Sequence, residues 1–266
     1  MRLLLLVGIT RRTGTNLLRD LLALHPEISA ASHLSEDCLL APSQHLIDYE
    51  RWITGTWSNW APDDALVEYR SDLYQGFGKA IEGVLLSQAE DPDARFLASK
   101  SPVSRNLSLL PQLLPGRPLV VITRDGRSTV ESTMRSFQTP FKEATQLWID
   151  GARSLLELRV SPAVEGKDFH VVRFEDLRSD LEGTLRSLVT TLELESDQTF
   201  LDRAVSLPVK GSCDEVAESG KVEWTPTQRG SDFRPEQRHA EWTSRRRKQF
   251  AKLAGPEQEA LGYSLD

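Results

Sequence analysis

The sequence predicts an α/β fold in which a central parallel sheet is flanked by helices on both faces. Short apolar runs rich in Val, Ile and Leu, each bounded by charged or turn residues, are typical of buried parallel strands. They occur at residues 3–7, 95–98, 118–123 and 169–174. The segments between them show apolar residues at helical spacing, and the repeated order of strand and helix favours a doubly wound sheet with right-handed crossovers.

The predicted helices follow these strands along the chain. They cover residues 15–24, 71–86, 103–114, 127–137, 141–158 and 181–192, and a last helix covers 235–253. The stretch from 209 to the last helix is polar and has little apolar periodicity. Since we find no internal repeat, low-complexity tract or clear linker, we expect a single domain over residues 1–266.

The composition is that of an ordinary globular protein and excludes several functions. The chain has 266 residues, with 39 acidic and 32 basic side chains and a net charge of -7, so it lacks the surplus of Lys and Arg that nucleic-acid or anionic-membrane binding requires. No apolar run approaches the roughly 20 residues of a membrane span. Two cysteines, Cys38 and Cys213, make no disulfide framework. We expect a cytoplasmic protein with no membrane span and no nucleic-acid partner.

The negative charge is concentrated in one segment. Residues 36–91 carry eleven acidic and three basic side chains, so the rest of the chain is close to neutral. Basic clusters outside this segment therefore oppose the sign of the whole chain. They mark the places where an anion could bind.

The first apolar run leads into a loop rich in Gly, Thr and Arg that opens a helix, Gly8-Ile-Thr-Arg-Arg-Thr-Gly-Thr-Asn. Such a loop presents backbone N–H groups and the positive end of a helix dipole, which favour a phosphate-like anion. The loop is not a Walker A motif, because Gly8 and Gly14 are six residues apart and Thr15 stands where Lys is required. An ATPase or kinase of that type is disfavoured, and a tight turn with exposed arginines is the other interpretation.

This loop resembles that of the sulfotransferase family, whose members use 3'-phosphoadenosine 5'-phosphosulfate (PAPS). The family loop reads Arg or Lys, Ser, Gly, Thr, Thr before an apolar helix, and Arg12, Gly14 and Thr15 match it. Thr13 keeps the hydroxyl of the usual Ser, and Asn16 keeps a polar group in place of the second Thr. The resemblance implies a P-loop-like sulfotransferase fold. It assigns the 5'-phosphosulfate of the cofactor to Arg11, Arg12, Thr13, Gly14, Thr15 and Asn16.

A second motif, Thr123-Arg-Asp-Gly-Arg-Ser-Thr-Val-Glu-Ser, repeats the order of strand, charged turn and helix. In the family, an Arg at the end of this strand and a Ser eight residues later bind the 3'-phosphate, and Arg124 and Ser132 have that spacing. An arginine supplies a forked cationic donor and the serine adds a hydroxyl. Gly126 stands where the family usually has Pro. Taken alone, the motif also fits a solvated helix start capped by Asp125.

Two further matches concern the reaction centre and the adenine base. Lys100-Ser-Pro resembles the family's Lys-x-Pro, whose lysine reaches the reaction centre, so Arg12 and Lys100 are implied as catalytic cations. Val172-Arg-Phe-Glu-Asp-Leu resembles a segment whose Tyr contacts adenine in many members, and Phe174 keeps the aromatic face of that Tyr. The resemblance covers most of the chain but not residues 39–91, where we expect a variable insertion on the acceptor side.

The general base is sought after the first helix, because some family members carry a catalytic carboxylate shortly after a His-Pro-Glu or His-Pro-Asp. The chain has His25-Pro-Glu at this place, and counting along the pattern leads to His33 and Glu36. An imidazole can serve because it titrates near neutral pH, and a carboxylate can serve where burial makes it more basic. We favour Glu36 over His33.

A basic stretch from 229 to 248 carries seven basic and three acidic side chains. In the family, a late segment before a Trp-bearing helix folds over the 3'-phosphate, and Arg229, Gly230 and Trp242 follow that order loosely. The resemblance therefore implies a cofactor-covering segment around 209–248, with Arg229 and Gly230 on the cofactor. A solvated basic helix face is the other interpretation of residues 245–248.

Three of the six tryptophans, Trp52, Trp57 and Trp60, lie close together in the acidic segment. Tryptophan faces stack on sugars, aromatic rings and apolar surfaces, so these residues are candidates for the lining of an acceptor pocket. Packing of a lid onto the core is an equally good explanation of them.

The sequence thus predicts a PAPS-dependent sulfotransferase that releases 3'-phosphoadenosine 5'-phosphate (PAP). We expect no metal, since no cluster of His, Cys or carboxylates has metal-ligand spacing. The expected acceptor is a hydroxyl, or less favourably an amine, of a small molecule or carbohydrate. Two alternatives stay open, a P-loop-type NTPase or small-molecule kinase and a non-catalytic nucleotide-binding module. The sequence does not give the oligomeric state.

Overall fold

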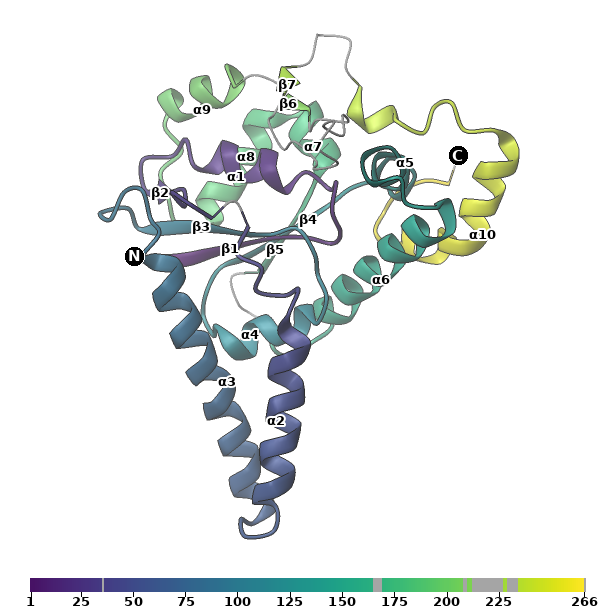
Figure 1. The fold of residues 1–266 in the computed structure, drawn as a ribbon. Helices are drawn as coiled ribbons and strands as arrows, with labels where there is room; N and C mark the ends of the chain where they lie inside the picture. Colours follow the sequence, from purple (N-terminus) through teal and green to yellow (C-terminus); the bar gives the residue numbers. More distant parts are fainter. Residues whose placement is uncertain (35, 165–168, 208–209, 212–226, 229–233, 266) are drawn as a thin grey trace, which may run out of the picture.

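The centre of the molecule is a five-stranded parallel sheet with the strand order β2-β3-β1-β4-β5 (Figure 1). The strands are β1 (Arg2–Gly8), β2 (Ile28–Ser29), β3 (Phe96–Ser101), β4 (Leu119–Thr123) and β5 (Phe169–Arg173). The computed structural model describes residues 1–266 except 35, 165–168, 208–209, 212–226, 229–233 and 266. The predicted α/β class and the four predicted strands are confirmed.

Helices cover both faces of this sheet, as predicted (Figure 1). Alternate side chains of β1 point to opposite faces, so that Leu3 and Leu5 join one apolar core while Leu4 and Leu6 join the other. The first face carries α4 (Leu110–Leu113), α6 (Phe141–Arg159) and α10 (Ser244–Ala260), and the second carries α1 (Thr15–Leu22), α7 (Phe174–Ser179), α8 (Leu181–Thr191) and α9 (Gln198–Val205). Burial on both faces explains why β1 reads as an unbroken apolar run.

Two long helices form a hairpin that projects away from the sheet (Figure 1). They are α2 (Ser43–Trp57) and α3 (Asp63–Leu86). Only residues 71–86 of α3 were expected from the sequence, and α2 was not expected at all. The apolar spacing that identifies a core helix is weak here, because much of each helix surface faces solvent and the hairpin is held partly by a polar contact of Glu50 with Arg70 and Tyr74.

Other elements differ from the sequence prediction in length. The helix expected over 103–114 is only a short 3-10 turn, η1 (Leu107–Leu109), followed by α4. The last helix begins at Ser244 rather than at Pro235, which starts only the 3-10 turn η2 (Pro235–Gln237). The sequence also missed the two-residue β2, α9 and the antiparallel pair of β6 (Lys210–Gly211) with β7 (Thr227–Gln228).

The parallel arrangement brings the carboxyl ends of β1, β3, β4 and β5 to one edge of the sheet. The loops that leave this edge begin α1, α5 (Gly126–Phe137) and α7, and α5 packs against α6 and α10. In open parallel sheets, ligands bind at this edge. Within the described residues, no helix has both the length and the apolar character needed to cross a membrane.

Candidate active site at the carboxyl edge of the sheet

The loop between β1 and α1 folds back over the end of its strand. The hydroxyl of Thr13 is buried and donates a hydrogen bond of 2.8 Å to the carbonyl of Thr10. Gly14 has a φ of 107°, and a Cβ at this position would lie 2.5 Å from the ring of Phe174. Both the backbone conformation and the packing therefore require glycine here.

Helix α1 begins directly after this loop with Thr15 and Asn16. Among the described residues, no side chain caps the helix and its first turn carries no acidic residue. The N–H groups of the first turn, together with the positive end of the helix dipole, can therefore bind an anion. From the other face of the sheet, Gly151 of α6 comes so close to the Ile9 carbonyl that a Cβ would lie 1.9 Å from its oxygen. The loop is therefore fixed from both faces.

Arg12 connects the two sequence motifs. Its backbone is in the left-handed region, with a φ of 73°, and its carbonyl accepts a hydrogen bond of 2.8 Å from the guanidinium of Arg124. Its own Nε donates to the hydroxyl of the buried Ser132, at 3.0 Å. The residues that the resemblance assigned to opposite ends of the nucleotide are thus in contact.

Arg124 is a buried cation whose charge is only partly compensated. Its guanidinium lies 4.5 Å from the centre of the Phe174 ring and donates to the carbonyl of Pro235. Burial lowers the pKa of Arg124 to about 10, an effect that Glu175 opposes. Its Nε is buried and has no hydrogen-bond partner among the described residues. A buried donor without an acceptor is costly, so this position fits an anionic ligand.

Lys100 is a second buried cation at the same edge. It lies near the end of β3, and its Nζ donates to Asn16 Oδ1 at 2.6 Å and to Glu36 Oε1 at 3.3 Å. Burial lowers the pKa of Lys100, while the negative charge of Glu36 counteracts this shift. The lysine therefore joins the first turn of α1 to the segment after β2.

The structure brings Glu36 into contact with Lys100, and shows no such contact for His33 among the described residues. Glu36 is partly exposed and forms an ion pair with Lys100, whereas His33 is exposed. The position of Glu36 is set by its neighbour Asp37, whose carboxylate accepts hydrogen bonds from Ser99, at 2.7 Å, and from Ser101.

The C-terminal part of the chain packs on the start of α5. Asp125 caps α5, as the motif suggested, by accepting from the backbone of Arg127 and Ser128. Ser128 in turn bonds to the ring of His239 at 2.9 Å. The buried Trp242 donates to Glu131 at 2.7 Å. Arg229 and Gly230, which the resemblance placed on the cofactor, lie outside the described residues.

Comparison with known proteins agrees with this geometry. The profile described as the sulfotransferase family matches residues 5–198, well over half of the chain. The chain belongs to the sulfotransferase family. No match was found among curated proteins.

Solved sulfotransferases share the fold at low sequence identity. The sulfotransferase domain from the curacin biosynthetic pathway is 16% identical with a TM-score of 0.54, over 100% of this chain and 99% of that one. A mouse sulfotransferase complexed with PAP is 12% identical with a TM-score of 0.54, over 97% and 84%. A sulfotransferase from Alicyclobacillus acidocaldarius is 11% identical with a TM-score of 0.52, over 99% and 97%. This likeness concerns the fold.

Arg11 belongs to the loop at this edge, whereas the three tryptophans predicted to line the acceptor pocket do not gather there. Arg11 is exposed and lies 5.6 Å from the centre of the Phe137 ring. Trp52 and Trp60 are 66% and 76% exposed on the projecting hairpin, and Trp57 packs edge-on against Tyr69 at 5.7 Å. These three tryptophans belong to α2 and to the turn before α3, and this hairpin projects away from the sheet (Figure 1). The structure therefore does not place them beside Lys100, where the prediction of an acceptor pocket requires them.

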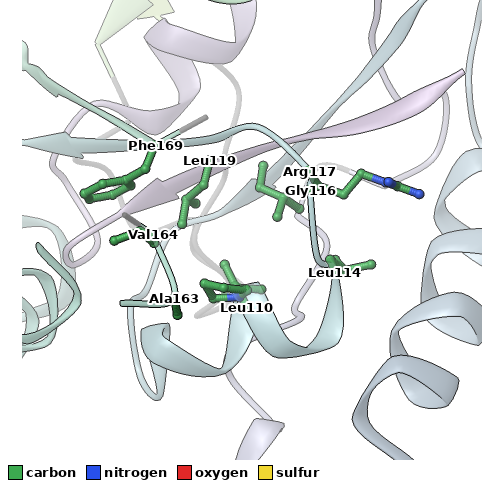
Figure 2. A pocket seen from close by; sticks show the side chains of 10 residues that line it. Leu110, Leu114, Gly116, Arg117, Leu119, Ala163, Val164 and Phe169 are labelled. Carbon is green, nitrogen blue, oxygen red and sulfur yellow. The ribbon is translucent and has the colours of Figure 1, made fainter. Parts of the chain in front are cut away.

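An apolar pocket of this sulfotransferase lies at the opposite edge of the sheet. Figure 2 shows its lining, which includes Leu119 and Phe169 at the starts of β4 and β5. The charged member of the lining, Arg117, is paired with Glu82 at 2.6 Å. This pocket is remote from the cationic edge and has no group suited to sulfuryl transfer.

Asp37 is the residue of the site that the sequence analysis missed. The signal was the Ser-Lys-Ser alternation of β3, since a strand points alternate side chains to opposite faces and so aims Ser99 and Ser101 together, away from Lys100. A carboxylate is a natural partner for two adjacent hydroxyls. Within the described residues, no group of three or more His, Cys, Asp or Glu side chains could hold a metal ion.

Proposed function

We propose that this protein transfers the sulfuryl group of PAPS to a hydroxyl of a small-molecule or carbohydrate acceptor, an amine being the less favoured acceptor. The observation that carries the proposal is the cluster of Arg12, Arg124 and Ser132, in which a buried guanidinium keeps an Nε without an acceptor among the described residues. A nucleotide with anionic groups at both its 3' and 5' positions matches these donors. Family membership supports the sulfuryl group as the one transferred.

The residues fit the nucleotide in two groups. Arg124 and Ser132 are suited to the 3'-phosphate, because a guanidinium and a hydroxyl on one side supply charge and hydrogen bonds. Arg12, Thr15, Asn16 and the N–H groups of the first turn of α1 are suited to the 5' end. When bound, PAPS supplies an activated sulfuryl group and leaves as PAP. The mouse sulfotransferase of the same fold was solved with PAP, which supports this nucleotide as the ligand.

The reacting groups of the chain are Lys100 and Glu36. Sulfuryl transfer resembles phosphoryl transfer, so positioning and charge stabilisation account for most of the catalysis. The Lys100 ammonium, held by Asn16 at 2.6 Å, stabilises negative charge that develops at the reaction centre. Glu36 accepts the proton of the acceptor hydroxyl, since its carboxylate lies 3.3 Å from Lys100 and is partly open to solvent. Contact of Phe174 with adenine stays a prediction.

Nucleotide binding tests the cofactor. Isothermal titration should show that PAP binds more tightly than adenosine 5'-phosphate, and that Arg124→Ala weakens PAP by at least about 30-fold, since truncating one partner of a buried charge pair costs 2 kcal/mol or more. The affinity for adenosine 5'-phosphate should change far less. Arg186→Ala, which removes an exposed arginine on α8, is the matched control. Equal loss for both nucleotides would contradict the assignment of Arg124 to the 3'-phosphate.

Activity in the presence of a chelator separates the proposal from its rivals. Transfer of ³⁵S from labelled PAPS should persist in EDTA. An enzyme that ignores PAP but hydrolyses ATP only with magnesium would be an NTPase or kinase instead. Tight PAP binding without transfer to any acceptor would indicate a non-catalytic module.

A further inference from the structure

One side of the projecting hairpin is lined by aromatic side chains from both of its helices. Two ring contacts mark this side, Tyr49 with Phe77 at 5.8 Å between the ring centres and Trp57 with Tyr69 at 5.7 Å. Within each helix the two aromatic residues are eight positions apart, so they belong to one stripe of that helix. The stripes of α2 and α3 therefore lie next to each other and face the same way.

Apolar residues continue these stripes between and beyond the rings. Ile53 lies midway between the two rings of α2, and Leu73 lies midway between the two rings of α3. On α3 the helical spacing extends to Leu66 toward the turn of the hairpin and to Val84 toward the sheet. We call this surface the apolar side of the hairpin. Its central residues are Tyr49, Ile53, Trp57, Tyr69, Leu73 and Phe77.

The apolar side is left partly open in the single chain. Tyr49 is 49% exposed, Tyr69 44% and Val84 64%, while Ile53 and Leu73 are buried only in part. The far half of the hairpin stands clear of the other elements (Figure 1). Single exposed apolar residues are common on protein surfaces, but a continuous patch that spans two helices is typical of an interaction surface.

The charged residues of the hairpin lie off its apolar side. Residues 43–86 carry seven acidic and three basic side chains. Helical geometry places Asp48 of α2 and Glu68 of α3 on the opposite side of the hairpin, and Glu50 is paired with Arg70 between the helices. Two copies can therefore meet through their apolar sides without bringing like charges together. An anionic membrane is a poorer partner, because the hairpin as a whole is acidic.

The apolar side is large enough for a specific contact. At 1.5 Å per residue the stretch from Leu66 to Val84 is about 27 Å long, and two helices side by side are about 20 Å wide. Two copies that meet over this footprint bury about 1,100 Å² in total, which exceeds the roughly 1,000 Å² expected of a specific interface. Tyr and Trp are also the side chains that contribute most to such contacts.

We propose that the apolar side of the hairpin is the contact surface for a second copy of this chain, and that the two hairpins pack as a four-helix bundle. A surface without charges does not select a partner of opposite charge, and a second copy offers an apolar surface of the same length. The contact is two-fold symmetric, so each copy contributes the same residues. This proposal does not rest on the proposed function.

Sedimentation equilibrium of the full chain tests the contact. The modest area predicts a reversible dimer with a Kd in the micromolar range. Raising the sodium chloride concentration should leave the dimer intact or tighten it, because the contact is apolar and each copy has a net charge of -7. A chain that stays monomeric up to submillimolar concentration would overturn the proposal. A dimer that dissociates in high salt would also overturn it, since such a dimer is held by opposite charges.

Substitutions on the two helices test the location of the contact. Tyr49→Arg and Tyr69→Arg each place a cation on the apolar side of both copies, and each should weaken the dimer by at least about 30-fold. Ser71→Arg adds the same charge at an exposed position on the opposite side of α3, and it is the matched control that should leave the Kd unchanged.

Thermal unfolding followed by circular dichroism shows whether each variant is folded. The two tyrosines are on different helices and both are well exposed, so a variant that fails to fold leaves the other to decide. An unchanged Kd in a folded Tyr49→Arg or Tyr69→Arg protein would overturn the proposal. A loss of the dimer in Ser71→Arg equal to that in the tyrosine variants would do the same.

Discussion

The projecting hairpin and the carboxyl edge of the sheet both bury charged side chains, but they compensate the charges differently. In the hairpin, the carboxylate of Glu50 accepts hydrogen bonds from Arg70 at 2.5 Å, Tyr74 at 3.1 Å and Thr54 at 3.1 Å. At the edge, the Nε of Arg124 has no partner among the described residues, and burial lowers the pKa of Lys100.

Under the proposed function, this difference separates a charge that serves the fold from a charge that serves a ligand. A carboxylate with a full set of donors holds two helices together. A buried cation without a full set of acceptors costs stability, and such groups gather where a ligand completes them. Substitutions in the two regions should therefore have opposite consequences for stability and activity.

Lys100→Met should give the largest effect. Loss of one positioned donor at a reaction centre lowers kcat by about 100- to 1,000-fold. The melting temperature should stay the same or rise, because the burial that lowers the pKa of Lys100 makes its ammonium a cost to the fold. Initial rates with labelled PAPS and calorimetric melting measure both quantities. Lys79→Met, at an exposed position of α3, is the control. A lower melting temperature with unchanged kcat would show that Lys100 stabilises the fold, as Glu50 does, and would contradict the distinction between the two regions.

Glu50→Ala should lower stability and leave activity unchanged, which is the reverse of the effect expected for Lys100→Met. It leaves the buried Tyr74 hydroxyl without its acceptor, so the free energy of unfolding should fall by about 1–3 kcal/mol, while PAP affinity and kcat stay unchanged. Urea unfolding measures the change. Asp48→Ala removes an exposed carboxylate of the same helix and should stay within about 0.5 kcal/mol of wild type. A matching loss of activity would show that the hairpin is coupled to the site.

The difference in stability between wild type and Glu50→Ala should depend on pH, and the pKa of Glu50 fixes the sign of this dependence. Burial of Glu50 raises its pKa, but hydrogen bonds from Arg70 and Thr54 outweigh burial and leave the pKa below the ordinary value of 4.5. A carboxyl whose pKa is lower in the folded state stabilises the protein above pH 4.5, and it loses this contribution as the pH falls through the lowered pKa. The stability difference between wild type and Glu50→Ala should therefore shrink in acid.

The smallest effect is expected at the exposed tryptophans of the hairpin. Trp52→Ser and Trp60→Ser should change stability by less than about 0.5 kcal/mol, since both side chains are mostly in solvent. Their kcat/KM for an accepted alcohol should stay within twofold of wild type. A large loss would support the sequence prediction that these residues line the acceptor pocket.

Local patterns predicted the sheet and the glycine turn of the loop between β1 and α1. The unbroken apolar run of β1 indicates that both faces of the strand are buried. Gly14 indicates a left-handed backbone conformation that other residues rarely adopt. Arg124 directly follows β4 and Ser132 lies in α5, and each contacts Arg12. Strand burial and turn conformation depend on residues that are close together in the sequence, so the sequence predicts them.

The hairpin and the acceptor side depend on distant contacts and could not be read in this way. Helix α2 buries Glu50 against Arg70 and Tyr74, so a charged residue occupies the position where an apolar one would have signalled the packed face. The role of Asp37 depends on serines of β3 that lie more than sixty residues later. The contact of Arg12 with Ser132 likewise joins segments that only the sheet brings together.

The close approach of Gly151 to Ile9 has a consequence for how the molecule could be divided or redesigned. The shape of the loop between β1 and α1 is a property of the assembled sheet and α6, because the helix backbone rests directly on the loop. A fragment that ends before α6 would carry the whole loop motif and lack the surface that shapes it. Even an added methyl group at residue 151 would act as a wedge and displace the loop.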